Sequence, residues 1–233
     1  MARVKAIFDA DILIHLVETD SIKFALETLE CIFVSEYVYQ YEIKKDTEVG
    51  RKIKKLKNTE KIKILQYRRL TSQQQKVYRE TYKLLKKEDI SVDPEENPIN
   101  EGERITAAFA KSCNIYYYMS DDNRAAPYIK SLAAVEVINF CDILFLYLWV
   151  FGKDDIEQLR KNYKSFINSY DADKIPRIIK DKGSILTFEK MMGRCYDKFH
   201  NSDRLKGLIN NIKFYAKHQA KMVGVFFMPK YSI

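Results

Sequence analysis

Glycine and proline are scarce in this sequence, with 7 Gly and 5 Pro among 233 residues. Because both residues interrupt helices and strands, their scarcity favours long regular elements over a loop-rich fold. None of the four cysteines belongs to a C-x-x-C pair, and none of the three histidines has the spacing of a zinc ligand. The pattern predicts buried or free thiols in a reducing compartment and argues against zinc.

Signals for export or membrane insertion are also missing from the sequence. No early segment joins an apolar run to a small-residue cleavage site. The most apolar stretch, residues 135–151, carries Glu136, Asn139 and Asp142, so it predicts a buried helix rather than a membrane span. We therefore expect a cytoplasmic protein with no membrane partner.

The net charge of +8 is unevenly distributed along the chain. Residues 1–43 carry 3 Lys/Arg against 8 Asp/Glu, and residues 88–152 carry 4 against 11. Residues 44–87 carry 16 Lys/Arg against 4 Asp/Glu, and residues 153–233 carry 17 against 9. A basic surface beside an acidic pocket suits an enzyme that acts on phosphodiesters, because cations hold the polyanion while carboxylates hold metal. Solvated lysine-rich helices explain the composition equally well.

Short apolar runs alternate with helical patterns over the first 150 residues. Runs rich in β-formers, which predict strands, lie at residues 4–8, 31–34, 115–119 and 135–138. Apolar spacing typical of helices follows these runs, at residues 12–17, 22–29, 35–43 and 105–112, and in the segment after residue 138 through Trp149. The alternation predicts an α/β fold with a parallel β-sheet flanked by helices.

Two segments depart from this alternation. Residues 44–100 form a basic and mainly helical insert, with an apolar run at 62–65, a helix after Ser72 and a loop at 93–98. Gln75, three residues after Ser72, is the expected capping-box partner. The apolar face of this helix is expected at Val77, Tyr78, Leu84 and Leu85.

From about residue 152 the pattern is helical and lacks strands. We therefore expect an α/β domain over residues 1–150 and a helix-rich extension over 151–233. The apolar tail at 223–233 predicts either a closing strand or a surface for a partner.

Carboxylates follow the expected strands at the points where these strands end. The carboxyl ends of parallel strands share one edge of a sheet, so the acids near them are expected to meet in one pocket. A cluster of this kind is stabilised by a hard divalent cation such as Mg²⁺ or Mn²⁺. Six acids qualify by position: Asp9, Asp11, Glu42, Glu103, Asp121 and Asp122.

Each acid also has a purely structural interpretation, and Glu42, on an expected helix, would ordinarily be solvated. Glu103 lies three residues after Asn100, which is the spacing of a helix capping box. Asp121 or Asp122 would serve as the cap of the helix that follows. Asp9 is the hardest to explain in this way, because a carboxylate at the end of an apolar strand is half-buried and needs a partner.

Four segments of the chain resemble the PIN-domain nucleases in order and spacing. They are 7–14 (IFDADILI), 34–43 (VSEYVYQYEI), 102–103 (GE) and 119–122 (MSDD), within a resemblance that covers roughly residues 3–150. The resemblance implies a parallel sheet between helices and Mg²⁺- or Mn²⁺-dependent cleavage of RNA.

By motif position, the resemblance implies that four acids are the catalytic metal ligands: Asp9, Glu42, Glu103 and Asp121. Asp122 is a further candidate ligand, because the doubled aspartate leaves the register open by one residue. Asp11, where the family more often has a small polar residue, and Ser120 are expected to support the ligands without binding the metal.

The expected activity is therefore that of a metal-dependent endoribonuclease, whose bound metal makes hydroxide from water and neutralises charge on the phosphate. The resemblance further implies a toxin-type nuclease silenced by an inhibitory protein partner, an antitoxin. RNA processing without a partner, an inactive RNA-binding or scaffold module, and a homodimer are open alternatives. Four basic residues of the insert are expected to contact RNA unless they are merely solvated: Lys52, Lys55, Arg68 and Arg69.

Overall fold

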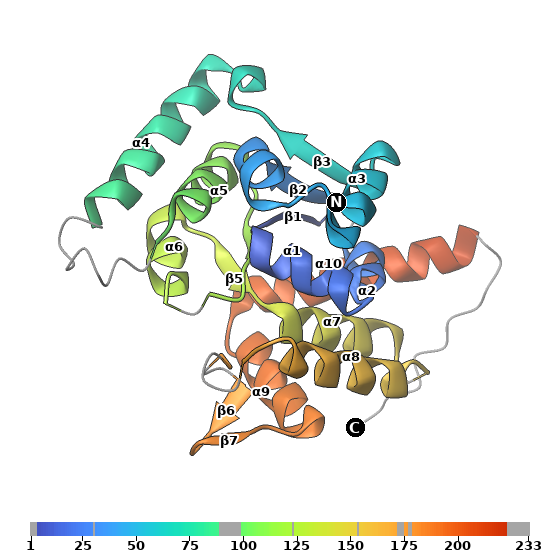
Figure 1. The fold of residues 1–233 in the computed structure, drawn as a ribbon. Helices are drawn as coiled ribbons and strands as arrows, with labels where there is room; N and C mark the ends of the chain where they lie inside the picture. The colour runs from blue at the N-terminus through green and yellow to red at the C-terminus, as the bar shows by residue number, and fades with distance from the viewer. Residues whose placement is uncertain are drawn as a thin grey trace.

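The protein is built on a five-stranded, fully parallel β-sheet with the strand order β3-β2-β1-β4-β5. The computed structural model describes residues 4–29, 31–88, 99–122, 124–152, 154–171, 175–176 and 179–222. Helices cover both faces of the sheet (Figure 1), which confirms the expected α/β class. The strands are β1 (Lys5–Phe8), β2 (Cys31–Ser35), β3 (Ile62–Leu65), β4 (Tyr117–Met119) and β5 (Glu136–Ile138).

Helices connect the strands and continue after the last one. Those within the sheet region are α1 (Ala10–Glu18), α2 (Ile22–Thr28), the π-helix η1 (Val38–Glu42), α3 (Glu48–Asn58), the 3₁₀ turn η2 (Tyr67–Arg69), α4 (Ser72–Glu88), α5 (Glu101–Ser112), α6 (Ala126–Ala133) and α7 (Phe140–Phe151). The extension consists of α8 (Ile156–Asn168), the short antiparallel pair β6 (Lys180–Asp181) and β7 (Ser184–Ile185), α9 (Phe188–His200) and α10 (Asp203–Met222).

The alternation of side chains along β1 assigns the helices to the two faces of the sheet. Ala6 and Phe8 point into the larger core, which includes residues of α1, α2, α3 and α7. Ile7 points the other way, beside Tyr118 of β4, into a smaller core closed by α4, α5 and α6. All three β1 residues are fully buried, as expected for a central strand covered on both sides.

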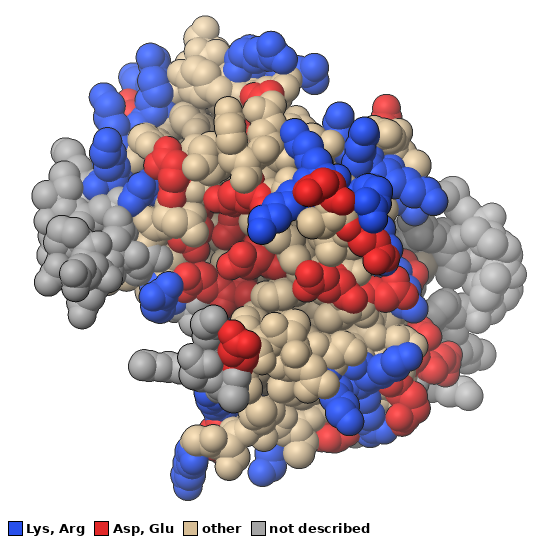
Figure 2. All heavy atoms as spheres, viewed as in Figure 1, with Lys and Arg blue, Asp and Glu red and all other residues tan. Residues whose placement is uncertain are grey.

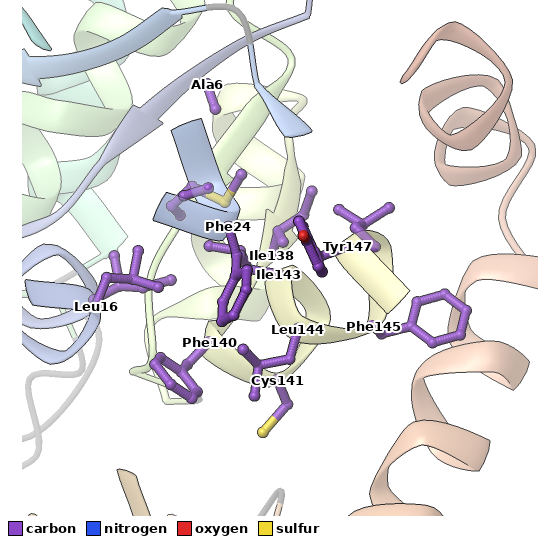
Figure 3. Close-up of a cluster of buried hydrophobic side chains, with 14 of the residues drawn as sticks. Ala6, Leu16, Phe24, Ile138, Phe140, Cys141, Ile143, Leu144, Phe145 and Tyr147 are labelled. Carbon is purple, nitrogen blue, oxygen red and sulfur yellow. The ribbon is translucent and has the colours of Figure 1, made fainter. Parts of the chain in front are cut away.

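Helix α7 joins the extension to the sheet domain. Figure 3 shows its side chains among those of β1, β5, α1 and α2. The ring of Tyr147 lies 4.4 Å from that of Phe24 in α2, and the ring of Phe145 lies 5.2 Å from that of Phe199 in α9. The larger core thus runs without interruption into α8, α9 and α10. No helix within the described ranges combines the length and apolar character needed to span a membrane.

Three local predictions were wrong. The extension contains the short strands β6 and β7 and so does not lack strands. In the basic insert, whose other described elements are helical, the apolar run at 62–65 forms the edge strand β3. The capping box of α4 pairs Thr71 with Gln74 rather than Ser72 with Gln75, because the Gln75 amide donates to backbone carbonyls instead.

On the same helix, Leu85 is buried, but the adjacent Leu84 is 48% exposed. Neighbouring helical residues point about 100° apart, so a single contact face cannot take both. The expected loop at 93–98 and the tail at 223–233 lie outside the described residues.

Candidate functional site

The candidate site lies at the carboxyl edge of the sheet, where β1 and β4 are neighbours. The chain leaves β1 toward β2 on one side and leaves β4 toward β5 on the other, which makes this point the topological switch of the sheet. Parallel sheets of this kind bind ligands at such a point. The backbone N–H of Asp9 donates to the carbonyl of Met119 (2.9 Å), so the two strands stay paired up to the first acid.

Asp9 is buried, with 3% of its surface exposed, and its Oδ1 atom has no hydrogen-bond partner. It precedes α1 at the N-cap position, yet its side chain makes no capping hydrogen bond. Burial raises the pKa of Asp9 well above its ordinary value, and the charges of Glu103, Glu42 and Asp11 raise it further. The geometry therefore does not support a structural role as a helix cap.

Glu103 combines the two roles that the sequence left as alternatives. Its Oε2 atom accepts the Asn100 N–H (2.8 Å) and its own N–H donates to Asn100 Oδ1 (2.9 Å), which confirms the capping box. Its Oε1 atom is buried without a hydrogen-bond partner. Burial, with smaller contributions from Asp122, Asp11 and Glu42, raises the pKa of Glu103 to about 8.

Glu42 reaches the site through an unusual turn. The Ile43 N–H donates to the carbonyl of Val38 (3.1 Å), which closes the π-helical turn η1 that ends at Glu42. π-helical turns are rare and frequent at functional sites. The carboxylate packs on Gly102, where a Cβ atom would lie only 2.1 Å from Glu42 Oε1. Burial raises the pKa of Glu42, and the charge of Asp11 adds to the effect.

The two aspartates after β4 are held differently. Asp122 accepts the Arg124 N–H at 2.7 Å and the Ala125 N–H at 3.4 Å, so it caps the turn that leads into α6. The backbone N–H of Asp122 donates to Ser120 Oγ (3.1 Å), so Ser120 supports the segment that carries Asp122. Asp121 instead accepts the N–H of Phe140, the first residue of α7, at 2.8 Å.

Asp11, which precedes His15 by one turn of α1, links the two parts of the cluster. Burial raises the pKa of Asp11, and the charges of Asp121 and Asp122 raise it further, although His15 acts against them. Asp122, rather than Asp121, also acts on Glu103. The six predicted acids thus form one electrostatically connected group, in which the charge of Asp122 raises the pKa of Glu103 and Asp121 is hydrogen-bonded to His15.

His15 is the site residue that sequence reasoning missed. Its Nδ1 atom lies 2.9 Å from Asp121 Oδ2. Burial lowers its pKa, but the hydrogen bond to Asp121 and the charges of Asp121, Asp11 and Glu18 outweigh burial and raise the pKa above its ordinary value. The available signal was the i, i+4 spacing from Asp11, which places both side chains on the same side of α1.

The donor set suits a hard divalent cation, because it consists of carboxylates and includes two buried oxygens without partners. In the part of the chain that the structure describes, no three Asp, Glu, His or Cys side chains are arranged closely enough to form a ready metal-ligand group. Asp9, Glu42, Glu103 and either Asp121 or Asp122 are the residues that could hold the cation after side-chain adjustment.

The basic residues lie outside the acidic cluster. In Figure 2, Asp and Glu side chains gather between α1 and the pair α5 and α6, and Lys and Arg side chains border them. A groove of about 540 Å³ runs along the edge strand β3. Its lining includes the cations Lys57, Lys63 and Arg69, one acid, Glu60, and an apolar floor that includes Ile62.

Of the four basic residues predicted to contact RNA, Arg69 lines this groove and the others do not. Lys52 forms an exposed ion pair with Glu48 at 2.9 Å on α3. Lys55 and Arg68 are exposed. Comparisons of the chain with protein-family models, with curated proteins and with solved structures find no match.

Proposed function

We propose that this protein is a metal-dependent endoribonuclease of the PIN type, which hydrolyses RNA phosphodiester bonds at the carboxyl edge of its sheet. One observation carries the proposal: Asp9 Oδ1 and Glu103 Oε1 are buried without hydrogen-bond partners inside a group of mutually repelling carboxylates. Buried charges of one sign are costly unless a counter-charge is present. A divalent cation supplies that charge.

In this proposal Asp9, Glu42 and Glu103 hold the cation together with Asp121 or Asp122. When bound, the cation supplies a water of lowered pKa and neutralises charge on the scissile phosphate. The carboxylates keep the site negative enough to favour a cation, and the capping box fixes the backbone from which Glu103 extends. Gly102 gives Glu42 the space to approach α5.

The groove along β3 is the proposed track for the RNA backbone. Its three cations offer phosphate contacts, and its strand leads to the same edge of the sheet as Asp9. The exposed ring of Tyr67, just after β3, offers a surface on which an unpaired base can stack. These features favour a single-stranded RNA substrate.

The experiment that tests the activity is cleavage of a labelled single-stranded RNA with Mn²⁺ or Mg²⁺, against the same reaction in EDTA. Asp9→Asn keeps the size of the side chain and removes the charge, so it should abolish metal-dependent cleavage. Asp203→Asn, the same change at a 99% exposed side chain on α10, is the matched control and should cleave normally. RNA binding without cleavage by the folded wild type would refute the nuclease and favour the alternative of a binding module.

The groove is tested separately by RNA affinity. Lys63→Glu and Arg69→Glu should each weaken RNA binding and reduce its salt dependence, with metal binding unchanged. Lys164→Glu places the same charge reversal on an exposed residue of α8 and should leave the affinity as it is. Equal losses in all three variants would show that net charge, rather than the groove, controls binding.

The resemblance also implies an inhibitory protein partner, which is proposed on that ground alone. A toxin-type nuclease should arrest the growth of a bacterial host that expresses it without its partner. The Asp9→Asn variant should be harmless at the same expression level. Equal growth with both proteins would remove the toxin proposal and leave RNA processing as the role to test.

A further inference from the structure

A chain of three side chains connects the acidic site to the C-terminal extension. Asp121 Oδ2 lies 2.9 Å from Nδ1 of His15, and the hydroxyl of Tyr170 lies 3.3 Å from the same nitrogen. Asp121 follows β4, His15 is on α1, and Tyr170 follows α8. Three segments that are distant in the sequence therefore meet at Nδ1 of His15.

The direction of the hydrogen bond follows from its partners. A carboxylate only accepts, so the Nδ1–H of His15 donates to Asp121 Oδ2. The other oxygen, Oδ1, accepts the Phe140 N–H at 2.8 Å. Each carboxylate oxygen has two lone pairs, so both bonds fix the orientation of Asp121 and still leave it able to bind a cation.

The surroundings of His15 give its ring a fixed position. The ring packs against Phe166 with centroids 5.2 Å apart and against Tyr170 with centroids 5.0 Å apart. Only 16% of its side chain and 6% of that of Asp121 are exposed. A ring enclosed by aromatic neighbours on α8 and just beyond it holds its N–H in one direction.

We propose that His15 is a positioning residue, which orients Asp121 for the divalent cation, and that Tyr170 makes the C-terminal extension a working part of the site. The inference rests on the proposed metal-dependent function. Groups that hydrogen-bond a metal ligand typically change metal affinity 10–100-fold when they are removed. The opposing interpretation is that His15 merely fills space among Phe166 and Tyr170.

Two substitutions separate the interpretations, because they divide the properties of histidine between them. His15→Asn keeps an N–H donor near the position of Nδ1 but fills less of the aromatic pocket. His15→Leu fills the pocket but has no donor. If His15 positions Asp121, the Asn variant should bind metal more tightly than the Leu variant although its fold is less stable. If His15 only fills space, the Leu variant should have both the higher metal affinity and the higher stability.

The measurement is Mn²⁺ affinity by titration calorimetry on the full chain, with thermal unfolding of each variant in EDTA. His15→Leu should weaken Mn²⁺ binding about 10–100-fold, and His15→Asn should recover most of the loss. Tyr170→Phe, which removes only the hydroxyl, should cause a smaller loss than His15→Leu. Asp9→Asn serves as the reference for a lost ligand.

Each outcome gives a decision. If wild type binds Mn²⁺ and Asp9→Asn does not, but neither His15 variant changes the affinity, the positioning role is overturned and the proposed function survives. A higher affinity of His15→Leu than of His15→Asn likewise overturns it in favour of packing. If wild type binds no Mn²⁺, the proposed function falls, and the positioning role falls with it.

Discussion

Neutralising Glu103 should stabilise the metal-free protein at alkaline pH. Its pKa is about 8 in the folded protein, against an ordinary value of 4.5. Between these two pH values the folded state binds more protons at Glu103 than the unfolded state does, so the free energy of unfolding falls as pH rises. The penalty is absent below about pH 4.5 and complete above about pH 8.

The magnitude follows from the size of the shift. One pKa unit corresponds to about 1.4 kcal/mol, so ionised Glu103 lowers the free energy of unfolding by at most about 5 kcal/mol. Glu103→Gln removes the ionisation and keeps an oxygen for the Asn100 N–H, so the capping box survives. The variant should gain on the order of 4 kcal/mol at pH 8 and nearly nothing at pH 4.5.

The assay is urea unfolding in EDTA at both pH values, because it gives the free energy of unfolding by linear extrapolation. Glu101→Gln is the matched control, two residues away on the same helix. The Glu101 carboxylate accepts a hydrogen bond from the Tyr82 hydroxyl (2.8 Å) and pairs with Arg104 (3.1 Å), so its neutralisation should bring no gain. Adding Mn²⁺ should stabilise the wild type more than Glu103→Gln, since a cation relieves the repulsion that the substitution removes.

Equal stability of wild type and Glu103→Gln at pH 8 would refute the reasoning. It would mean that Glu103 is ionised in the folded protein without penalty, and that its buried oxygen is solvated or paired. A variant that lost stability at both pH values would instead show that the capping box needs the carboxylate.

Three further predictions concern other parts of the molecule. Gly102→Ala should weaken Mn²⁺ binding and RNA cleavage, because the added Cβ would collide with the Glu42 carboxylate. This loss is expected although alanine has the higher helix propensity. Normal activity would show that Glu42 is not needed in its present position. Lys198→Met should lower the free energy of unfolding by about 2–3 kcal/mol in a urea titration. The substitution leaves the carboxylate of Asp142, which is 1% exposed, without its ion-pair partner. An unchanged urea midpoint would contradict this prediction. Leu85→Ala should cost about 2–4 kcal/mol in the same assay and expose α4 to proteolysis first, because Leu85 is the fully buried leucine of that helix.

The sheet and much of the site follow from rules that act over short distances. Four of the five strands were predicted from apolar runs, and the fifth, β3, coincides with the apolar run at 62–65. The capping box of Asn100 and Glu103 was readable from a spacing of three residues. The convergence of Asp9 with Asp121 follows from a single general rule, that parallel strands end at a common edge. These parts were predictable because each depends on local pattern or on sheet topology.

The missed features depend on contacts between distant segments. His15 contacts Asp121 across 106 positions of sequence, and the local sequence around His15 does not predict this contact. The turn at Val38–Glu42 differs from an α-helix only in its hydrogen-bond spacing, which side-chain propensity does not encode. The close approach of Glu42 to Gly102 likewise exists only after packing.

The central position of β1 governs when the site exists during synthesis. β1 emerges well before its neighbour β4, which ends at Met119, and the core around α7 includes residues as late as Ile212. Because a chain emerges from its N-terminus, Asp9 precedes Asp121 by 112 residues (121 − 9), and the six carboxylates cannot all meet before the segment after β4 has been translated. The proposed metal site would therefore be incomplete on the nascent chain until Asp121 has emerged together with α7, whose Phe140 N–H donates to Asp121.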